Sequence, residues 1–291
     1  MTGWLVVNEF LNSNKFNEIH QWLLDAAKKQ GIKMELRTNA QLLIDISENA
    51  LQVMKGQVDF VLFWDKDVRL ARYLEQLGYP VYNSSEAIGI CDDKSLTHLT
   101  LMKEGIPMPR TMIAPMTFEN IGYTNLRFLE DVADHLKFPM VVKECFGSFG
   151  QQVYLVKNME ELKSKVMKIG VKPILFQEFV DSSFGKDIRL QVVGSEVIAS
   201  MYRYSENGDF RANLSIGGSM QTYTPTKEQM DLAIRSCEVI GLDFAGVDLL
   251  FGKDGEPIVC EVNSNAHFKN IYDCTGVNAA DAIIAHIKLQ F

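Results

Sequence analysis

The sequence lacks the features that mark secreted, zinc-binding or membrane proteins. Its five cysteines are scattered and none belongs to a CxxC pair, which favours free thiols in a reducing compartment over disulfides or a zinc site. The N-terminus has no basic region followed by a long apolar core, so no signal peptide is expected. No apolar run approaches the roughly 18 residues that cross a bilayer. We therefore expect a cytoplasmic protein that does not associate with membranes.

Signatures of several enzyme and binding classes are also missing. No GxGxxG loop follows an early strand, which argues against a dinucleotide site. Neither GxSxG nor HExxH is present, which argues against serine hydrolases and zinc proteases. The formal charge of −8 is unlike that of a nucleic-acid binder, so no nucleic-acid partner is expected. The five histidines form no catalytic group, and His267 is interpreted as structural.

What the sequence does contain is a long alternation of helix-like and strand-like segments. With 291 residues and 47% hydrophobic content, it is long enough for two or three domains with their own cores. Residue spacing predicts strands at 4–7, 58–64, 81–82, 140–145, 152–156, 174–180, 188–193 and 196–204, and helices at 16–29, 67–77, 126–136, 159–169, 227–240 and 279–289. Two short helices are also expected within 83–105, with Asp92 or Asp93 capping the second.

Two β-rich runs near the C-terminus, at 247–251 and 257–262, are joined by a short turn that contains glycine. A two-residue turn would set Asp248 opposite Glu261, with Asn263 on the same face of the sheet. A three-residue turn would shift the register by one and move Asp248 to the other face.

The pairing of Asp248 with Glu261 would place two carboxylates side by side. Such carboxylates repel and raise each other's pKa, and a divalent cation removes that cost. Mg²⁺ accepts carboxylate and amide oxygens and usually bridges to substrate phosphates, so Asn263 suits the same site. The alternative is a surface hairpin that carries polar residues by chance.

A glycine-rich segment, 145–150, lies between two predicted strands. Its backbone N–H groups can surround phosphate oxygens, and Lys143 in the preceding strand can reach an α- or β-phosphate. The next strand ends in polar residues, where backbone groups of Glu178 and Val180 can pair with an adenine edge and Asp181 can reach a ribose. The alternatives are an ordinary hairpin with a solvated lysine and a core strand followed by an acidic loop.

Basic residues gather on the following strands. Asp187 and Arg189 share one face of a predicted strand, Arg203 ends the next strand, and Arg211 and Asn213 follow in the loop. The planar guanidinium group suits phosphate and carboxylate, so these side chains can converge on either anion. Solvated strand ends are the alternative.

Taken in order, these segments are distinctive. The chain reads DDKSLTHLTLMKEGIPMPRT, VVKECFGSFG, FQEFV, GKDIRLQVVGSEVIASMYR, RANLSIGG, GVDLL and CEVNSN. The series resembles the ATP-grasp superfamily, specifically the RimK-like carboxylate–amine ligases, over nearly the whole chain from about residue 88. The resemblance implies an α/β and α+β fold. In it, an N-terminal open α/β domain (1–90) precedes a central lobe with a phosphate lid (91–185) and a C-terminal lobe with a metal site (186–291), and the two α+β lobes clasp ATP.

The resemblance also implies roles for single residues. The nucleotide-binding set is Lys94, Lys143, Gly147, Ser148, Phe149, Gly150, Gln177, Glu178, Phe179, Val180, Asp181 and Lys186. The catalytic set is Arg189, Arg203 and Asn213, and the metal-binding set is Asp248, Glu261 and Asn263. Within these sets, Lys94 and Lys143 would hold the α- and β-phosphates under a lid at 147–150. The two arginines would stabilise the transferring phosphoryl group.

The implied reaction starts when a carboxylate attacks the γ-phosphate of ATP, which gives an acyl phosphate and ADP. An amine then displaces phosphate and forms an amide or peptide bond. ATP and two Mg²⁺ ions, for which Mn²⁺ can substitute, are the expected cofactors. The expected partners are a small-molecule or peptide carboxylate, an amine such as an amino acid or peptide, and further copies of the chain in a homo-oligomer. The alternatives are a phosphotransferase acting on an acid or hydroxyl, and an ATP-binding regulatory protein without turnover.

The sequence departs from the family pattern at three places. Gln152 stands before Val153 where the family's lid usually has a third glycine, which predicts a stiffer lid. Residues 264–268 read SNAHF where the family is usually small and proline-containing, and Ile216 stands where arginine is frequent. The last two segments border the acceptor pocket, so glutamate is not carried over as a substrate.

Overall fold

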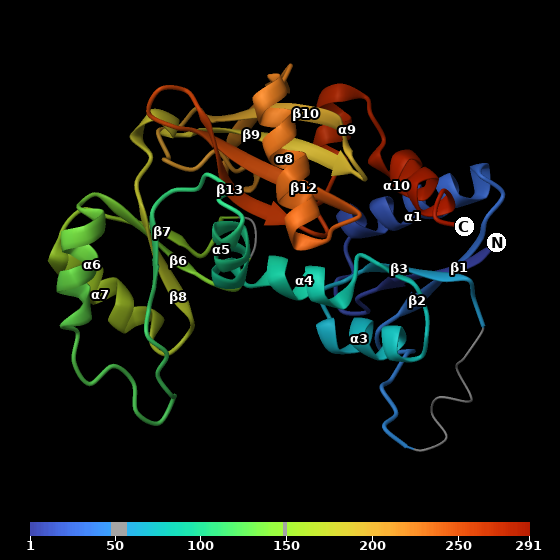
Figure 1. Cartoon of the computed structure of the whole chain (residues 1–291), viewed down its shortest axis with the longest axis horizontal. Coiled ribbons are helices and arrows are strands. Elements are labelled where there is room, and N and C mark those ends of the chain that lie inside the picture. The colour runs from blue at the N-terminus through green and yellow to red at the C-terminus, as the bar shows by residue number, and fades with distance from the viewer. Residues whose placement is uncertain (48–56, 148–149) are drawn as a thin grey trace.

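The N-terminal sheet is parallel, with the strand order β2-β1-β3-β4. The computed structural model describes residues 1–47, 57–147 and 150–291, and Figure 1 shows this sheet at one end of the molecule, near both chain termini. Its elements are β1 (Thr2–Val7), α1 (Asn14–Lys29), β2 (Lys33–Thr38), β3 (Phe60–Trp64), α3 (Val68–Gln76) and β4 (Val81–Tyr82). Every residue of β3 is buried, because a central parallel strand is covered on both faces.

The central sheet is antiparallel, with the strand order β5-β8-β6-β7. Its elements are β5 (Thr111–Ile113), α6 (Phe128–Leu136), β6 (Met140–Glu144), β7 (Val153–Val156), α7 (Met159–Ile169) and β8 (Ile174–Glu178). Alternate residues of β6 and β8, such as Val142 and Phe176, pack with α6 and α7 into one core. Because side chains alternate along a strand, Val141, Lys143 and Gln177 face away from that core.

The C-terminal sheet is antiparallel and has the order β11-β10-β9-β12-β13. Its elements are η1 (Asp181–Ser183), β9 (Lys186–Val193), β10 (Glu196–Ser205), η2 (Leu214–Ile216), β11 (Gly218–Thr222), α8 (Lys227–Ile240), β12 (Phe244–Phe251), β13 (Pro257–Asn263), α9 (Lys269–Thr275) and α10 (Ala279–Lys288). Figure 1 shows α8 across one face of the sheet. Residues of α4 (Ser85–Asp92) and α5 (Lys94–Lys103) join α8 in the core on that face.

The N-terminal and C-terminal sheets share a hydrophobic core that differs from the two cores described above. Helix α10 contributes to this core together with α1, and Trp64 of β3 lies 5.6 Å, centroid to centroid, from both Phe244 and Phe268. The fully buried Asn83, after β4, donates to the carbonyl oxygens of Phe244 and Ser264 at 2.9 and 3.0 Å. The core of the central sheet is separate from this one. The N-terminal and C-terminal sheets therefore pack together through this core. The sheet that is central in the sequence lies at the other end of the molecule (Figure 1), with a cavity between it and the C-terminal sheet.

The turn between β12 and β13 differs from the predicted two-residue turn. Gly252 N donates to Glu256 O at 2.7 Å, so the loop holds three residues, and Gly255 has the positive φ of 86° that this turn needs. A β-bulge at Cys260 inserts one residue into β13 and restores the register. Asp248 therefore lies opposite Glu261, as predicted. The turn prediction was wrong and the pairing is confirmed, because the bulge offsets the longer turn.

Most predicted elements are confirmed within the described residues. The helices at 159–169 and 227–240 have the predicted bounds, and Asp93 rather than Asp92 caps α5. Among the described residues, the strands β2, β5 and β11, the helix α9 and the short 3₁₀ helices η1 and η2 were not predicted. The three strands among them are all edge strands, and β2 has largely exposed side chains, so no apolar run marks it. Among the helices of the described ranges, none is long and apolar enough to cross a membrane.

Asp93 allows a test of how much its cap contributes to stability. Its carboxylate accepts hydrogen bonds from Ser95 N at 2.8 Å and from Ser95 Oγ at 2.6 Å. We expect Asp93→Ala to lower the free energy of unfolding by about 1 kcal/mol in urea denaturation. Asp92→Ala is the matched control, because Asp92 pairs with the half-exposed Lys66 and should cost less than about 0.5 kcal/mol. Equal losses in the two variants would contradict the capping role.

Candidate nucleotide and metal site

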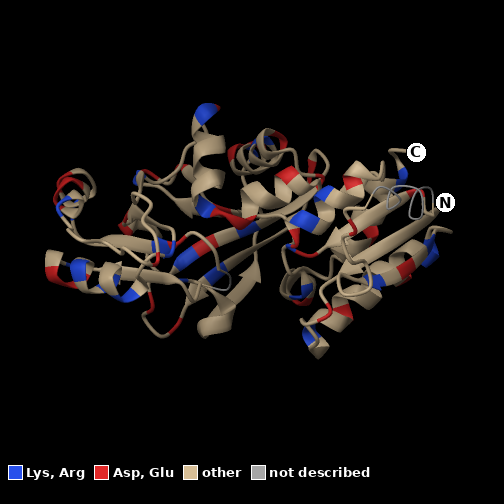
Figure 2. Ribbon diagram, turned by 90° about the horizontal axis from the view of Figure 1, so that it is seen from below, with Lys and Arg blue, Asp and Glu red and all other residues tan. Residues whose placement is uncertain are grey.

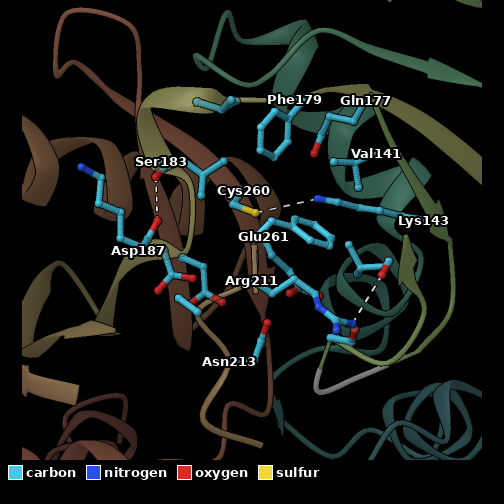
Figure 3. A pocket seen from close by; sticks show the side chains of 18 of the residues that line it. Val141, Lys143, Gln177, Phe179, Ser183, Asp187, Arg211, Asn213, Cys260 and Glu261 are labelled. Carbon is cyan, nitrogen blue, oxygen red and sulfur yellow. Dashed lines mark hydrogen bonds between the residues drawn. The ribbon is translucent and has the colours of Figure 1, made fainter. Parts of the chain in front are cut away.

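A cavity lies between the central sheet and the C-terminal sheet (Figure 3), and most of the predicted site residues line it. From α5 and the central sheet come Lys94, Lys143, Gly147, Gly150, Gln177, Glu178, Phe179 and Val180. From the C-terminal sheet and its loops come Lys186, Arg203, Asn213, Asp248 and Glu261. The fold thus brings residues from both sides of the cleft to one place.

Two lysines enter this cavity from different elements. Lys143 points out of β6, and Figure 3 shows it facing Cys260, with 3.8 Å between Nζ and Sγ. Lys94 is the first residue of α5, and its Nζ lies 2.9 Å from the Gly147 carbonyl oxygen and 3.6 Å from Glu261 Oε1. Both side chains are largely buried. Two cations therefore lie in the cavity that the glycine-rich loop lines, as expected for residues that bind phosphates.

The strand register builds a row of charged residues across the C-terminal sheet. Arg203 of β10 lies opposite Asp187 of β9, and Arg189 of β9 lies opposite Asp248 of β12, which in turn faces Glu261. Figure 2 shows acidic and basic segments next to one another on strands in the middle of the molecule. The opposite charges in the Arg203–Asp187 and Arg189–Asp248 positions attract each other, whereas the two carboxylates of Asp248 and Glu261 repel.

The contacts within this row are short. Arg189 binds Asp248 in a bidentate pair, with Nε–Oδ1 and Nη2–Oδ2 distances of 2.6 and 2.7 Å. Arg203 binds Asp187 in the same way at 2.7 and 2.8 Å, and also reaches Asp248 Oδ2 at 2.9 Å. Burial alone would raise the pKa of Asp248, but the two guanidinium groups hold it below its usual value. Asp248 is therefore ionised at neutral pH.

The predicted metal ligands occupy neighbouring positions at one end of this row. Asp248 faces Glu261, and Asn263 lies two residues further along β13, opposite Gly246. Asn263 Nδ2 is buried and has no hydrogen-bond partner among the described residues. Since the two ends of an amide are exchanged by a flip, the same position can present an oxygen to a cation. Two carboxylates and one amide oxygen fit Mg²⁺.

A second cavity, of about 900 Å³, adjoins the first. It lies between the N-terminal part and the C-terminal sheet, and its lining includes Arg189, Asn263 and His267. Arg203, Asn213 and Glu261 line both cavities, so the two meet at these residues. Gly246 brings the segment after β13 close to the sheet, because a Cβ there would lie 2.5 Å from Ala266 Cβ.

Some predicted residues lie elsewhere. Arg189 and Asn263 line the second cavity and not the first. Asp181 is exposed in η1 and lines neither cavity. Ser148 and Phe149, predicted as lid residues, lie outside the described residues.

Other residues of the site were not included in the predicted sets. Arg211 donates to the Gly150 carbonyl oxygen at 2.6 Å and is held by Asp209, so it ties the glycine-rich loop to the loop of Asn213. Asp187 and Cys260 also line the cavity. Arg211 could have been included in the predicted site because it lies two residues before Asn213 in the sequence. Asp187 could have been included because it lies on the same face of the predicted strand as Arg189.

His98 lies behind the cavity on α5 and gives stability a pH dependence. Burial, reinforced by Lys143, lowers the pKa of His98 to about 4, whereas an unfolded histidine titrates near about 6.5. Below about pH 6.5 the unfolded chain therefore binds a proton that the folded chain does not. The free energy of unfolding falls as the pH drops from about 6.5 to about 4, and this contribution levels off below that range.

We expect His98→Gln to remove this contribution. Over this pH window, the unfolding free energy of the variant should fall less steeply than that of the wild type, by up to about 1.4 kcal/mol per pH unit. Urea denaturation between about pH 7 and about pH 4.5 measures both slopes. Burial also lowers the pKa of His267 to about 4, so the variant should keep part of the dependence. Equal slopes for the two proteins would contradict the prediction.

A family model described as the RimK-like ATP-grasp domain matches residues 91–287. The chain belongs to the RimK-like ATP-grasp family. The resemblance and the fold predicted from the ordered motifs are thereby confirmed, with N-terminal α/β and later α+β parts. Since members of this family are ATP-grasp carboxylate–amine ligases, the chain is an enzyme of that class.

Individual proteins are similar to this chain over most of its length. An uncharacterized protein of Mycoplasma pneumoniae is 32% identical to this RimK-like chain over 279 residues, which are 94% of either chain. Human N-acetylaspartylglutamate synthase A is 37% identical over 206 residues, which are 70% of this chain and 51% of the synthase, so the match spans about half of that relative. The crystal structure of a RimK domain ATP-grasp protein from Sphaerobacter thermophilus matches with a TM-score of 0.73 at 20% identity, covering 98% of this chain and 99% of the other.

Proposed function

We propose that this RimK-like protein joins a carboxylate to an amine through an acyl phosphate and releases ADP and phosphate. The observation that carries the proposal is the junction of two cavities. One cavity holds the predicted ATP-binding residues, the other is larger, and they meet at Arg203, Asn213 and Glu261. A γ-phosphate at this junction would face a second site where a carboxylate and an amine have room to bind.

The nucleotide site is proposed from the central sheet. The backbone C=O of Glu178 and N–H of Val180, at the end of β8, would meet the adenine edge, with Phe179 and Gln177 beside the base. Glu178 N already donates to Arg110 O and Val180 O already accepts from Ser183 N, so those two groups are not the ones proposed to bind the base. Lys94 and Lys143 would bind the α- and β-phosphates, because both place a buried ammonium group in the cavity that Gly147 and Gly150 also line. These roles rest on the position of each side chain in the cavity.

The metal site is proposed at the end of the charged row. The family uses ATP and Mg²⁺. Asp248, Glu261 and Asn263 would hold Mg²⁺, which neutralises phosphate charge when bound. Arg189 and Arg203 are already fixed beside Asp248. Their guanidinium groups are thus positioned to donate to oxygens of the transferring phosphoryl group.

This arrangement suits phosphoryl transfer followed by amide formation. The first step needs in-line placement and charge neutralisation more than covalent catalysis, which explains a site rich in cations and carboxylates without a protein nucleophile. Arg211 binds the Gly150 carbonyl and so holds one end of the glycine-rich loop close to Asn213. A covered site protects an acyl phosphate from water.

The second cavity is proposed to bind the two substrates that become joined. Its volume of about 900 Å³ is at the upper end of the usual range for small-molecule sites, so an amino acid and a second acid or a short peptide both fit. The name of the human relative, N-acetylaspartylglutamate synthase A, agrees with an amino-acid substrate. Residues 264–267, from the segment that departs from the family pattern, form part of this lining. The identity of the two substrates is therefore left to experiment.

Phosphate release from Mg·ATP in the presence of paired acids and amines tests the proposal, with mass spectrometry of the product. The proposal predicts release that needs one acid and one amine together, with one amide formed for each phosphate. ADP accompanied by a stable phosphorylated product and no free phosphate would identify a phosphotransferase instead. ATP binding without turnover on any pair, including peptide acceptors, would favour a regulatory ATP-binding protein.

A further inference from the structure

A chain of hydrogen bonds behind the cavity starts at the backbone of α5. His98 Nδ1 lies 2.8 Å from the Lys94 carbonyl oxygen, and His98 is 7% exposed. A carbonyl oxygen only accepts, so Nδ1 must carry a hydrogen. The low pKa of His98 keeps the ring neutral at neutral pH. Nε2 is therefore the ring atom without a hydrogen, and it can only accept.

The amide of Gln177 meets this acceptor. Gln177 Nε2 lies 2.9 Å from His98 Nε2 and 2.9 Å from Thr111 Oγ1. Thr111 uses its own hydroxyl hydrogen on the Pro109 carbonyl oxygen, at 2.8 Å. The Thr111 oxygen must therefore accept as well. His98 Nε2 and Thr111 Oγ1 can both only accept, because a backbone carbonyl takes the hydrogen of each side chain. The Gln177 amide must therefore turn its nitrogen toward them.

The oxygen of Gln177 is consequently the end that faces the cavity. Gln177 lines the cavity, and Figure 3 shows it beside Phe179 and Val141. Among the described residues, no donor contacts Gln177 Oε1. This oxygen is also not one of the fully buried polar atoms that lack a partner. Although the two ends of an amide are assigned from their surroundings, here the network leaves one orientation. The cavity therefore presents a fixed acceptor at this point.

We propose that His98 is a positioning residue that makes the nucleotide site select adenine, because it fixes the Gln177 amide with its oxygen toward the base. The inference rests on the proposed function, since it takes this cavity to hold ATP. Adenine carries an amino group at C6, which donates to an acceptor. Guanine carries a carbonyl oxygen at the same place, which would face the Gln177 oxygen with neither able to donate.

Loss of the His98 acceptor removes one of the two constraints on the amide. In His98→Phe, Gln177 can turn over and present its NH₂ group to the base, where that group would bind the guanine oxygen. In His98→Gln, a side-chain carbonyl oxygen can again accept from the Gln177 amide. The two variants therefore separate loss of the acceptor from mere replacement of the ring.

Calorimetric binding of the Mg²⁺ complexes of the β,γ-imido analogues of ATP and GTP to the full chain tests the inference. For the wild type, we expect the ATP analogue to bind at least about tenfold more tightly. His98→Phe should lower this preference by about tenfold, and His98→Gln should restore most of it. Thr97→Val is the matched control on α5. It removes the buried hydroxyl contacts to the Ile90 and Asp93 carbonyls without touching Gln177, so it should leave the preference unchanged.

The outcomes are distinct. A wild type that binds neither analogue would reject the ATP site, and the inference with it. A wild type that prefers the ATP analogue, beside a His98→Phe variant with the same preference, would overturn the role of His98 alone. If His98→Phe binds neither analogue, the same binding measurement is made on Thr111→Val, which removes the other acceptor of the Gln177 amide. A reduced preference in Thr111→Val supports the fixed amide, and an unchanged one overturns it.

Discussion

Glu261→Gln is expected to remove most ATP turnover while leaving the fold intact. Glu261 is one of the three proposed metal ligands, and the change removes a negative charge without changing the shape of the side chain. Loss of charge stabilisation at the phosphoryl group should lower the rate of phosphate release by roughly 100- to 1,000-fold. The side chain is 30% exposed, and its Oε1 lies 3.6 Å from Lys94 Nζ, so stability should change by less than about 1 kcal/mol.

Phosphate release with the identified acid and amine, together with urea denaturation, measures both parts of this prediction. Glu256→Gln is the matched control in the same hairpin, since Glu256 lies in the exposed turn and lines neither cavity. It should turn over ATP at the wild-type rate. If Glu261→Gln releases phosphate as fast as the wild type, the metal assignment is wrong.

The pairing of Asp248 with Glu261 shows what the sequence could and could not predict. Alternation along two short strands, together with an assumed two-residue turn, placed both carboxylates on one face. The turn, however, has three residues, and the bulge at Cys260 restores the register that the longer turn would have shifted. A bulge depends on how two strands pack together, and nothing in the local sequence marked this one. The pairing prediction was therefore right because of the bulge, which the sequence did not predict, and not because of the predicted two-residue turn.

Residues that depend on distant contacts were the hardest to predict. His98 and Gln177 are 79 positions apart, and Asn83 and Phe244 are 161 positions apart. The role of a single buried polar residue cannot be predicted before its partner is known. Local periodicity describes only the helix or strand to which the residue belongs. Lys94 was found through the family pattern, which carries information about distant contacts that spacing within one chain does not. Lys143 was already indicated by its place in the strand before the glycine-rich segment.

The arginines illustrate a third limit. Their convergence was expected from their place at strand ends, and the register does bring Arg189 and Arg203 together. Their pairing with Asp187 and Asp248 was not expected, because the sequence shows charges but not which opposite charge faces each one. The row of cross-strand pairs explains how two guanidinium groups can be buried in a sheet. It also makes the site part of the structural core of the C-terminal sheet.

Arg203→Met is accordingly expected to cause the largest loss of stability among the site variants. The Arg203 side chain is 4% exposed and pairs with both Asp187 and Asp248. Asp187 would keep a buried carboxylate without its bidentate partner, which costs about 3–5 kcal/mol in the free energy of unfolding. Urea denaturation without nucleotide measures this loss. Lys227→Met, which breaks an exposed pair on α8, is the control and should leave stability unchanged.

The double variant Arg203→Met with Asp187→Leu separates the two causes of that loss. If the unpaired carboxylate of Asp187 is the cause, replacement of both residues by apolar ones should recover most of the stability. Activity should remain low in the double variant, because Arg203 lines both cavities and is proposed to donate to the transferring phosphoryl group. A stable double variant that still turns over ATP would contradict the catalytic role of Arg203. A stable Arg203→Met single variant would instead show that the buried charges are not coupled. The pair of measurements therefore distinguishes what this arginine contributes to the fold from what it contributes to the chemistry.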